Sequence, residues 1–138
     1  MADINLTNAE WNVMDCLWEK APQSGREIID TLKERVGWSK STTLTMLKRM
    51  TEKKLISCES DQKLRMYSPC IDRDDAVKKE TESFLKRVYK GSVSLMVSAM
   101  TQKQELSEDE IRELYEILKQ CQANEFGQES VSMPGQKL

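Results

Sequence analysis

Short hydroxyl side chains and long cations lie close together in residues 38–56, WSKSTTLTMLKRMTEKKLI. At about 100° per residue, most of its Ser and Thr residues share one helical face with Lys48 and Arg49. Small hydroxyls let a nucleic-acid groove approach closely, while the cations can reach phosphates or guanine edges. The segment therefore predicts a helix that binds duplex DNA, through Lys40, Ser41, Thr42, Leu44, Thr45, Lys48 and Arg49.

The opposite face of the same segment is suited to a protein core. Thr43, Leu47 and Met50 share it, and Met46 lies at its edge. The alternative is an ordinary amphipathic core helix whose Arg49 is solvated or paired with Glu52. That alternative does not explain why further cations follow in the next predicted element.

Charge is distributed unevenly along the 138 residues, although the formal net charge is only −2. Residues 31–65 hold nine Lys or Arg against four acids, whereas residues 104–129 hold two against eight. The two regions therefore have different tasks, and the basic one is suited to a nucleic-acid partner.

Three predicted helices position the candidate residues. A Ser or Thr followed three residues later by Glu marks a helix start. This pattern occurs at Thr7 and Ser24, before the first two of these helices, and again at Ser107, before a later one. The first helix is expected over about 8–20, and the second runs from about 25 to 35 and closes at Gly37. Ser39 can cap the third. Three tryptophans, Trp11, Trp18 and Trp38, are expected to pack on the core.

Beyond residue 54 the apolar period changes from helical to alternating. Residues 55–59 and 63–69 flank the polar turn SDQ at 60–62, which predicts a β-hairpin with Lys63 and Arg65 near its tip. Three helices followed by a basic hairpin predict a winged helix-turn-helix over residues 1–72. The third helix would enter the major groove, and the hairpin would touch the adjacent backbone. The whole fold is expected to be mainly α with this small β-hairpin.

Residues 73–121 are predicted to be helical, with strong apolar stripes but too little mass for an independent core. A second copy of the chain is the expected cover, although these helices could instead fold back on the DNA-binding domain. Residues 122–138 lose periodicity and are expected to be a disordered tail. The residues expected at the dimer seam are Phe84, Leu85, Val88, Ile111, Leu114, Ile117 and Leu118.

Several kinds of chemistry find no support in the composition. The chain has no histidine, which excludes histidine-dependent catalysis and histidine metal sites. The cysteines Cys16, Cys58, Cys70 and Cys121 form no CxxC and are expected to be ordinary thiols. We therefore expect no enzyme, cofactor or metal. Because no apolar run approaches about 20 residues and the N-terminus is too polar for a signal peptide, we expect a cytoplasmic protein.

Taken together, the motifs resemble those of the penicillinase repressors, the BlaI/MecI/CopY family. LTNAEWNVMDCLWEK is similar to its first helix, WSKSTTLTMLKRM to its recognition segment and KLRMYSPCI to its wing. FLKRVYKG followed by LSEDEIRELYEIL is similar to its dimerisation helices. The resemblance implies a homodimeric transcriptional repressor that binds a near-palindromic operator. In the antibiotic-resistance branch, a sensor-linked protease would release it by cleavage.

The chain departs from the family pattern at three places. Ala99 and Met100 stand where the antibiotic branch has Asn-Phe at the scissile bond, and they are the candidate proteolytic site here. The CxC motifs of the copper-responsive branch are absent from the sequence. Leu44 stands where Arg or Lys is frequent, so the operator can differ. Two alternatives remain open: a ligand-responsive repressor of the MarR type, and a winged-helix adaptor that binds another protein.

Overall fold

The computed structural model describes residues 5–61, 63–103 and 105–127. Its helices and strands divide into two compact units between Lys79 and Glu80, inside α4. The elements are α1 (Asn8–Glu19), β1 (Gln23–Ser24), α2 (Gly25–Val36), α3 (Lys40–Glu52), β2 (Ile56–Asp61), β3 (Leu64–Pro69), α4 (Arg73–Tyr89), α5 (Val93–Lys103) and α6 (Glu108–Gly127). The predicted mainly α fold with a small sheet is confirmed.

The first three helices begin where their capping residues predict. Thr7 Oγ1 accepts from the Glu10 amide at 3.1 Å, and the Glu10 carboxylate accepts from the Thr7 amide at 2.9 Å. Ser24 and Glu27 make the same reciprocal pair at the start of α2. Ser39 Oγ accepts from the Thr42 amide at 3.2 Å at the start of α3. These bonds satisfy amides that lack an intrahelical partner.

Two helix ends use the left-handed backbone conformation. Gly37 follows α2 with φ of 73°, and its amide donates to the carbonyls of Leu32 and Lys33. Lys54 follows α3 with φ of 67°, and the next amide, of Leu55, donates to Met50 O at 3.0 Å. Both arrangements close the carbonyl end of the helix before the chain turns.

The sheet has three antiparallel strands in the order β1-β3-β2. The predicted hairpin is confirmed, but β2 includes Ser60 and Asp61, which were expected in the turn, because strand pairing extends to Asp61 opposite Leu64. Strand β1 was not predicted. It has only two residues, Gln23 opposite Tyr67 and Ser24 opposite Met66, too few to show an alternating pattern.

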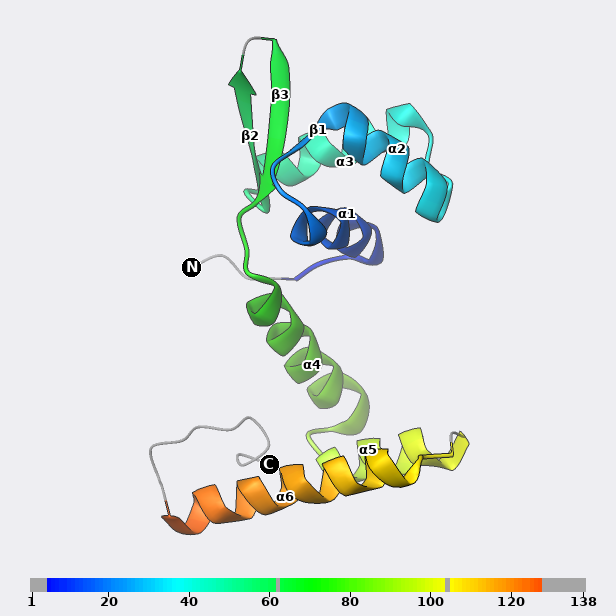
Figure 1. The fold of residues 1–138 in the computed structure, drawn as a ribbon, viewed down its shortest axis with the longest axis vertical. Helices are drawn as coiled ribbons and strands as arrows, with labels where there is room; N and C mark the ends of the chain where they lie inside the picture. Colours follow the sequence, from blue (N-terminus) through cyan, green and yellow to red (C-terminus); the bar gives the residue numbers. More distant parts are fainter. Residues whose placement is uncertain (1–4, 62, 104, 128–138) are drawn as a thin grey trace. The chain divides into compact units, whose positions relative to one another are not determined.

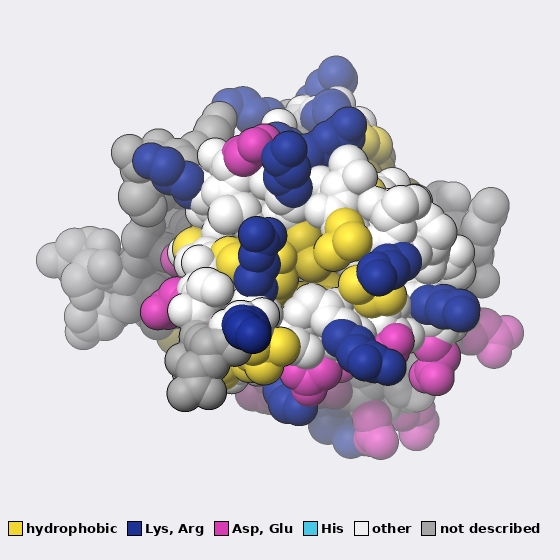
Figure 2. All heavy atoms as spheres, turned by 90° about the horizontal axis from the view of Figure 1, so that it is seen from above, with side chains coloured by type: hydrophobic (Ala, Val, Ile, Leu, Met, Phe, Trp, Pro, Cys, Tyr) yellow, Lys and Arg dark blue, Asp and Glu magenta, His cyan; other side chains and the backbone are white. Residues whose placement is uncertain are grey.

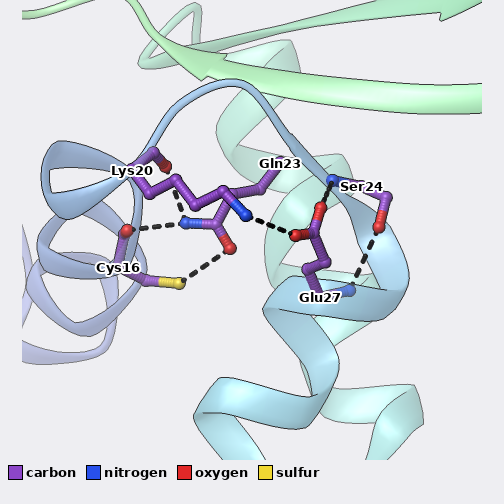
Figure 3. Close-up of polar contacts among 5 residues, drawn as sticks. All are labelled: Cys16, Lys20, Gln23, Ser24 and Glu27. Atoms are coloured by element: carbon purple, nitrogen blue, oxygen red, sulfur yellow. Dashed lines mark hydrogen bonds and ion pairs between the residues drawn. The ribbon is translucent and has the colours of Figure 1, made fainter.

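Buried Gln23 shows what holds β1 in place (Figure 3). Its Nε2 donates to Cys16 O at 2.8 Å and to Lys20 O at 2.7 Å, and so satisfies carbonyls at the end of α1. Beside it, Lys20 Nζ lies 2.9 Å from the Glu27 carboxylate. The segment between α1 and α2 is therefore held to α1 by the Gln23 hydrogen bonds and to α2 by the Lys20–Glu27 ion pair.

Helices α1, α2 and α3 gather beside the hairpin and bury a common core (Figure 1). Trp11, Trp18 and Trp38 pack against it half-buried, as predicted. The Trp18 indole also donates to Ile71 O at 3.0 Å. This arrangement confirms the winged helix-turn-helix. The largest fully buried side chains are Val13, Met14, Leu17, Ile28, Leu32, Thr43, Leu47, Met50 and Ile56.

Two expected boundaries differ from those observed. The first unit continues past residue 72 into α4, because Ala76 is only 1% exposed and belongs to the core of that unit. Helix α6 continues to Gly127, past the expected tail start at Gln122. Intrahelical hydrogen bonds need no apolar stripe, and Gln and Ala are good helix formers. Residues 128–138 of the expected tail lie outside the described residues. No helix in the described part of the chain is long and apolar enough to cross a membrane.

Candidate nucleic-acid interface

Helix α3 has one buried and one exposed face, as its sequence predicts. Thr43, Leu47 and Met50 are fully buried. All the residues predicted to contact DNA on this helix are exposed, and even Leu44 is 42% exposed. The helix thus presents a continuous surface, which we call the α3 face: Lys40, Ser41, Thr42, Leu44, Thr45, Lys48 and Arg49.

The hydroxyls of the α3 face keep hydrogen-bonding capacity for a partner. Ser39 Oγ donates to Thr42 Oγ1 at 3.0 Å, which leaves the Thr42 hydroxyl proton free to be donated elsewhere. Within the described residues, the Thr45 hydroxyl has no protein partner. A Ser or Thr hydroxyl can both donate and accept, so these groups suit phosphate oxygens and base edges alike.

The cations of the α3 face are not neutralised by the protein. No acidic side chain in the described ranges lies within 4.0 Å of Lys40, Lys48 or Arg49. The alternative pairing of Arg49 with Glu52 is therefore not formed. These charges remain available to an anionic partner.

Lys53, which contributed to the basic balance of the sequence, has a structural role instead. Its Nζ lies 2.6 Å from Glu10 Oε2, and Glu10 is only 3% exposed. Burial alone would raise the pKa of Glu10, but the bonds from Lys53 and Thr7 bring it below its ordinary value of 4.5. The pair joins the end of α3 to the start of α1. Sequence alone could not reveal it, because the partners are 43 residues apart.

The hairpin adds two cations near its tip, as predicted. Lys63 is exposed with φ of 79°, and no acid among the described residues pairs with it. Arg65 is exposed beside buried Tyr67. Burial and the neighbouring Cys58 raise the pKa of Tyr67, and Arg65 opposes that rise.

An open groove of about 620 Å³ lies between α2, the start of α3 and the hairpin. Lys40, Lys63 and Arg65 line it, together with Arg26 from the first turn of α2. Figure 2, which looks onto the hairpin end of the molecule, shows Lys and Arg side chains around an apolar patch. Sequence reasoning missed Arg26, because its place in a capped first turn indicated only a helix start.

The residues predicted at the dimer seam are largely uncovered. Leu85 and Leu114 are half-buried, and the others are exposed, with Leu118 at 62%. In the described part of the chain beyond Ala76, no apolar side chain is fully buried. Further apolar side chains exposed on α5 and α6 are Leu95, Val97, Met100 and Tyr115.

The candidate cleavage residues, Ala99 and Met100, are exposed on α5. All four cysteines are free thiols, and only Cys16 is buried. No cluster of three or more Cys, Asp or Glu residues in the described ranges is arranged to hold a metal ion. The described residues therefore assemble one surface with an evident ligand chemistry, the α3 face with its neighbouring hairpin.

Comparisons with known proteins find relatives that match most of the chain. The methicillin resistance regulatory protein MecI of Staphylococcus aureus (strain N315) is 34% identical over 113 residues, which cover 82% of this chain and 92% of that protein. The penicillinase repressor of Bacillus licheniformis is 33% identical over 115 residues, 83% of this chain and 90% of that protein.

Among solved structures, the Bacillus licheniformis BlaI monomeric form in complex with the blaP half-operator aligns with a TM-score of 0.49 and 30% identity. The alignment covers 54% of this chain and 93% of that chain. The sequence pattern of the penicillinase repressor family matches residues 6–120. This match takes in both units and most of the described residues, and the chain therefore belongs to the penicillinase repressor family.

Proposed function

We propose that the protein is a transcriptional repressor that binds an operator in double-stranded DNA as a homodimer. The observation that carries the proposal is the α3 face: small hydroxyls and unpaired cations on one exposed side of a helix whose other side is buried. A helix of this kind fits the major groove, and the hairpin cations beside it suit the phosphate backbone.

Individual residues would have different tasks at the operator. Arg49 can form a bidentate contact with a guanine or bind a phosphate, and Lys48 can bind a phosphate. Thr42 and Thr45 can meet a base edge or a phosphate oxygen. The apolar surface of Leu44 suits a thymine methyl group, which would favour a T at that position of the half-site.

The second unit supports dimerisation. Its apolar side chains are uncovered in a single chain, and unmatched apolar surface of this extent is typical of protein interfaces. Pairing two chains there would hold two α3 faces together, and the operator would then be a near-palindrome. Two linked protomers also double the phosphate contacts and steepen the salt dependence of binding.

Selection of genomic DNA fragments with the full-length protein tests the proposal. The recovered duplexes are then titrated by fluorescence anisotropy against the parent, Arg49→Ala and Thr45→Ala at physiological salt. Loss of Arg49 from a base contact is expected to weaken binding by about 1–3 kcal/mol. Lys33→Ala removes an exposed cation outside the α3 face and is the control.

Two outcomes would reject the assignment. Variants that bind as tightly as the parent would show that α3 does not face the duplex. Failure to enrich any fragment, with no salt-dependent DNA binding, would favour the protein-binding adaptor instead.

Release by proteolysis is a second part of the proposal, and Ala99–Met100 is the candidate bond. A cut there would separate α6 from the N-terminal unit and remove part of the proposed dimer contact. Mass spectrometry of the protein recovered from β-lactam-treated cells of its source tests this. A fragment ending at Ala99 would support cleavage, and a chain that is still intact after the operator has been released would exclude it.

A further inference from the structure

Four cations from three elements converge on the groove between α2, α3 and the hairpin. Lys40, Lys63 and Arg65 belong to the surface already proposed to bind DNA, but Arg26 comes from α2. Its guanidinium is exposed, and no carboxylate in the described ranges pairs with it. Arg26 therefore extends the basic surface beyond the recognition helix.

The acid next to Arg26 in sequence does not neutralise it. Glu27 accepts from the Ser24 amide at 2.9 Å and from Lys20 Nζ at 2.9 Å. These bonds, the Ser24 bond foremost, lower the pKa of Glu27 to about 2. The Glu27 carboxylate is thus held toward α1, and Arg26 is the cation that α2 contributes to the groove.

The shape and lining of the groove fit a chain of phosphates better than a single anion. The cations come from three elements that line an open groove rather than from one closed pocket. Its apolar lining also includes Ile29 and Leu64, which suits the faces of deoxyribose rings between phosphates. One strand of duplex DNA offers this alternation of charge and apolar sugar.

One acid marks a limit of this path. Asp30 lies one helical turn after Arg26 and also lines the groove. A carboxylate at this position repels a phosphate, so the strand would pass on the Arg26 side of Asp30.

We propose that Arg26 binds a backbone phosphate of the operator, and that one DNA strand runs through the groove between α2 and the hairpin, over Leu64. This inference rests on the proposed function, because it adds a strand path to the same DNA surface. It makes α2, and not only α3 and the hairpin, part of the interface.

Salt-dependent anisotropy of the full-length protein tests the inference. The probes are a labelled duplex recovered by the genomic selection and a duplex of scrambled sequence with the same length. A phosphate contact carries no base information, so Arg26→Ala is expected to weaken binding to both duplexes by a similar factor. It should also reduce the slope of log K against log salt by about 0.9 per protomer.

Matched variants separate a phosphate contact from a general loss of charge. Arg26→Lys keeps the charge and should keep the slope. Asp30→Asn removes the repulsive group and should strengthen binding to both duplexes. Lys33→Ala removes one exposed cation from the same helix, outside the groove, and should change neither affinity nor slope.

The results that would overturn the inference differ from those that would overturn the function. If Arg26→Ala kept the parent slope while Arg49→Ala lost binding, the DNA-binding function would stand and the strand path would be wrong. A loss confined to the selected duplex would mean that Arg26 reads a base, which also contradicts the inference. Thermal melting of each variant controls for folding. If the alanine variant is unstable, Arg26→Gln removes the same charge with a long, helix-compatible side chain and should reduce the slope by the same amount.

Discussion

Thr43 lies within the exposed hydroxyl run of α3 in sequence but is fully buried in the fold. Its Oγ1 has no hydrogen-bond partner among the described residues. A buried hydroxyl without a partner costs about 1–3 kcal/mol, and valine has the same branched shape without the polar atom. We expect Thr43→Val to raise the free energy of unfolding by about 1 kcal/mol, measured by urea denaturation.

Thr45→Val is the matched control for this prediction. It makes the same chemical change two residues away on the exposed α3 face, where the hydroxyl is solvated. We expect little change in stability but weaker operator binding, the reverse of Thr43→Val. Equal stability changes in the two variants would contradict the role assigned to burial.

For single residues, the sequence predicted which face of a helix a side chain occupies better than it predicted which residues that side chain contacts. The 3.6-residue period placed Thr43 inside and Thr45 outside, because both follow from helix geometry alone. It could not show that Lys53 pairs with Glu10, or that Arg26 reaches the hairpin groove. Those relations depend on how separate elements pack, which local spacing does not encode.

Among the elements, α2 begins with a capping pair that makes stability depend on pH. The Ser24 amide and Lys20 lower the pKa of Glu27 from 4.5 to about 2 in the folded protein. A carboxyl whose pKa is lower in the folded than in the unfolded protein stabilises the fold at pH values above its unfolded-state pKa. That stability is lost as pH falls from about 4.5 to about 2. We expect Glu27→Gln to flatten this part of the stability–pH curve, measured by urea denaturation at several pH values.

Ser24→Ala distinguishes the two halves of the capping pair. It removes the hydroxyl that accepts from the Glu27 amide but keeps the Ser24-position amide that donates to the Glu27 carboxylate. We expect the free energy of unfolding to fall by about 1 kcal/mol at all pH values. Its further decrease at acid pH, which comes from Glu27, should be retained. Identical pH profiles for Ser24→Ala and Glu27→Gln would contradict this division.

Helix α2 ends at a position where glycine is required by backbone conformation. Gly37 has φ of 73°, and no atom lies within 4 Å of the place a Cβ would occupy. Any effect of Gly37→Ala must therefore come from the left-handed backbone, and we expect a loss of about 1 kcal/mol. Thermal or urea unfolding measures it.

Gly25→Ala is the matched substitution at the other end of α2. Its backbone φ is not positive, and the new Cβ would lie 3.6 Å from the Tyr67 ring, an ordinary contact. We expect no loss of stability, or a gain of up to about 1 kcal/mol from the stiffer unfolded chain. A loss as large as that of Gly37→Ala would contradict the conformational explanation.

Helix starts were the best-predicted feature at the scale of elements, because a cap is a local arrangement of three or four residues. The capping pairs at Thr7 and Ser24 correctly marked the starts of α1 and α2, and Gly37 marked the end of α2. Strand β1 was missed because pairing with β3, about 43 residues later, creates it. The continuation of α6 to Gly127 was missed because apolar periodicity ends before helical hydrogen bonding does.

For the whole molecule, the two units differ in what covers their apolar side chains. The first unit buries its own core, whereas the second leaves most of its large apolar side chains exposed, Leu118 among them. The sequence predicted this contrast from the amount of chain available to each part. The point of division, between Lys79 and Glu80, could not be predicted, since it depends on Ala76 packing into the first core.

Leu118 therefore provides a test of the proposed dimer in the full-length protein. An aspartate buried in an apolar seam would lose its hydration without a partner, so Leu118→Asp should weaken dimerisation by about a hundredfold or more. Gln120→Asp adds the same charge two residues along α6, about 200° around the helix, and should leave the dimer intact. Sedimentation velocity over a range of concentrations measures both. Operator affinity should fall with Leu118→Asp alone, because separate protomers lose the linked half-site contacts. A parent chain that sediments as a monomer, or equal behaviour of the two variants, would show that α6 does not form the seam.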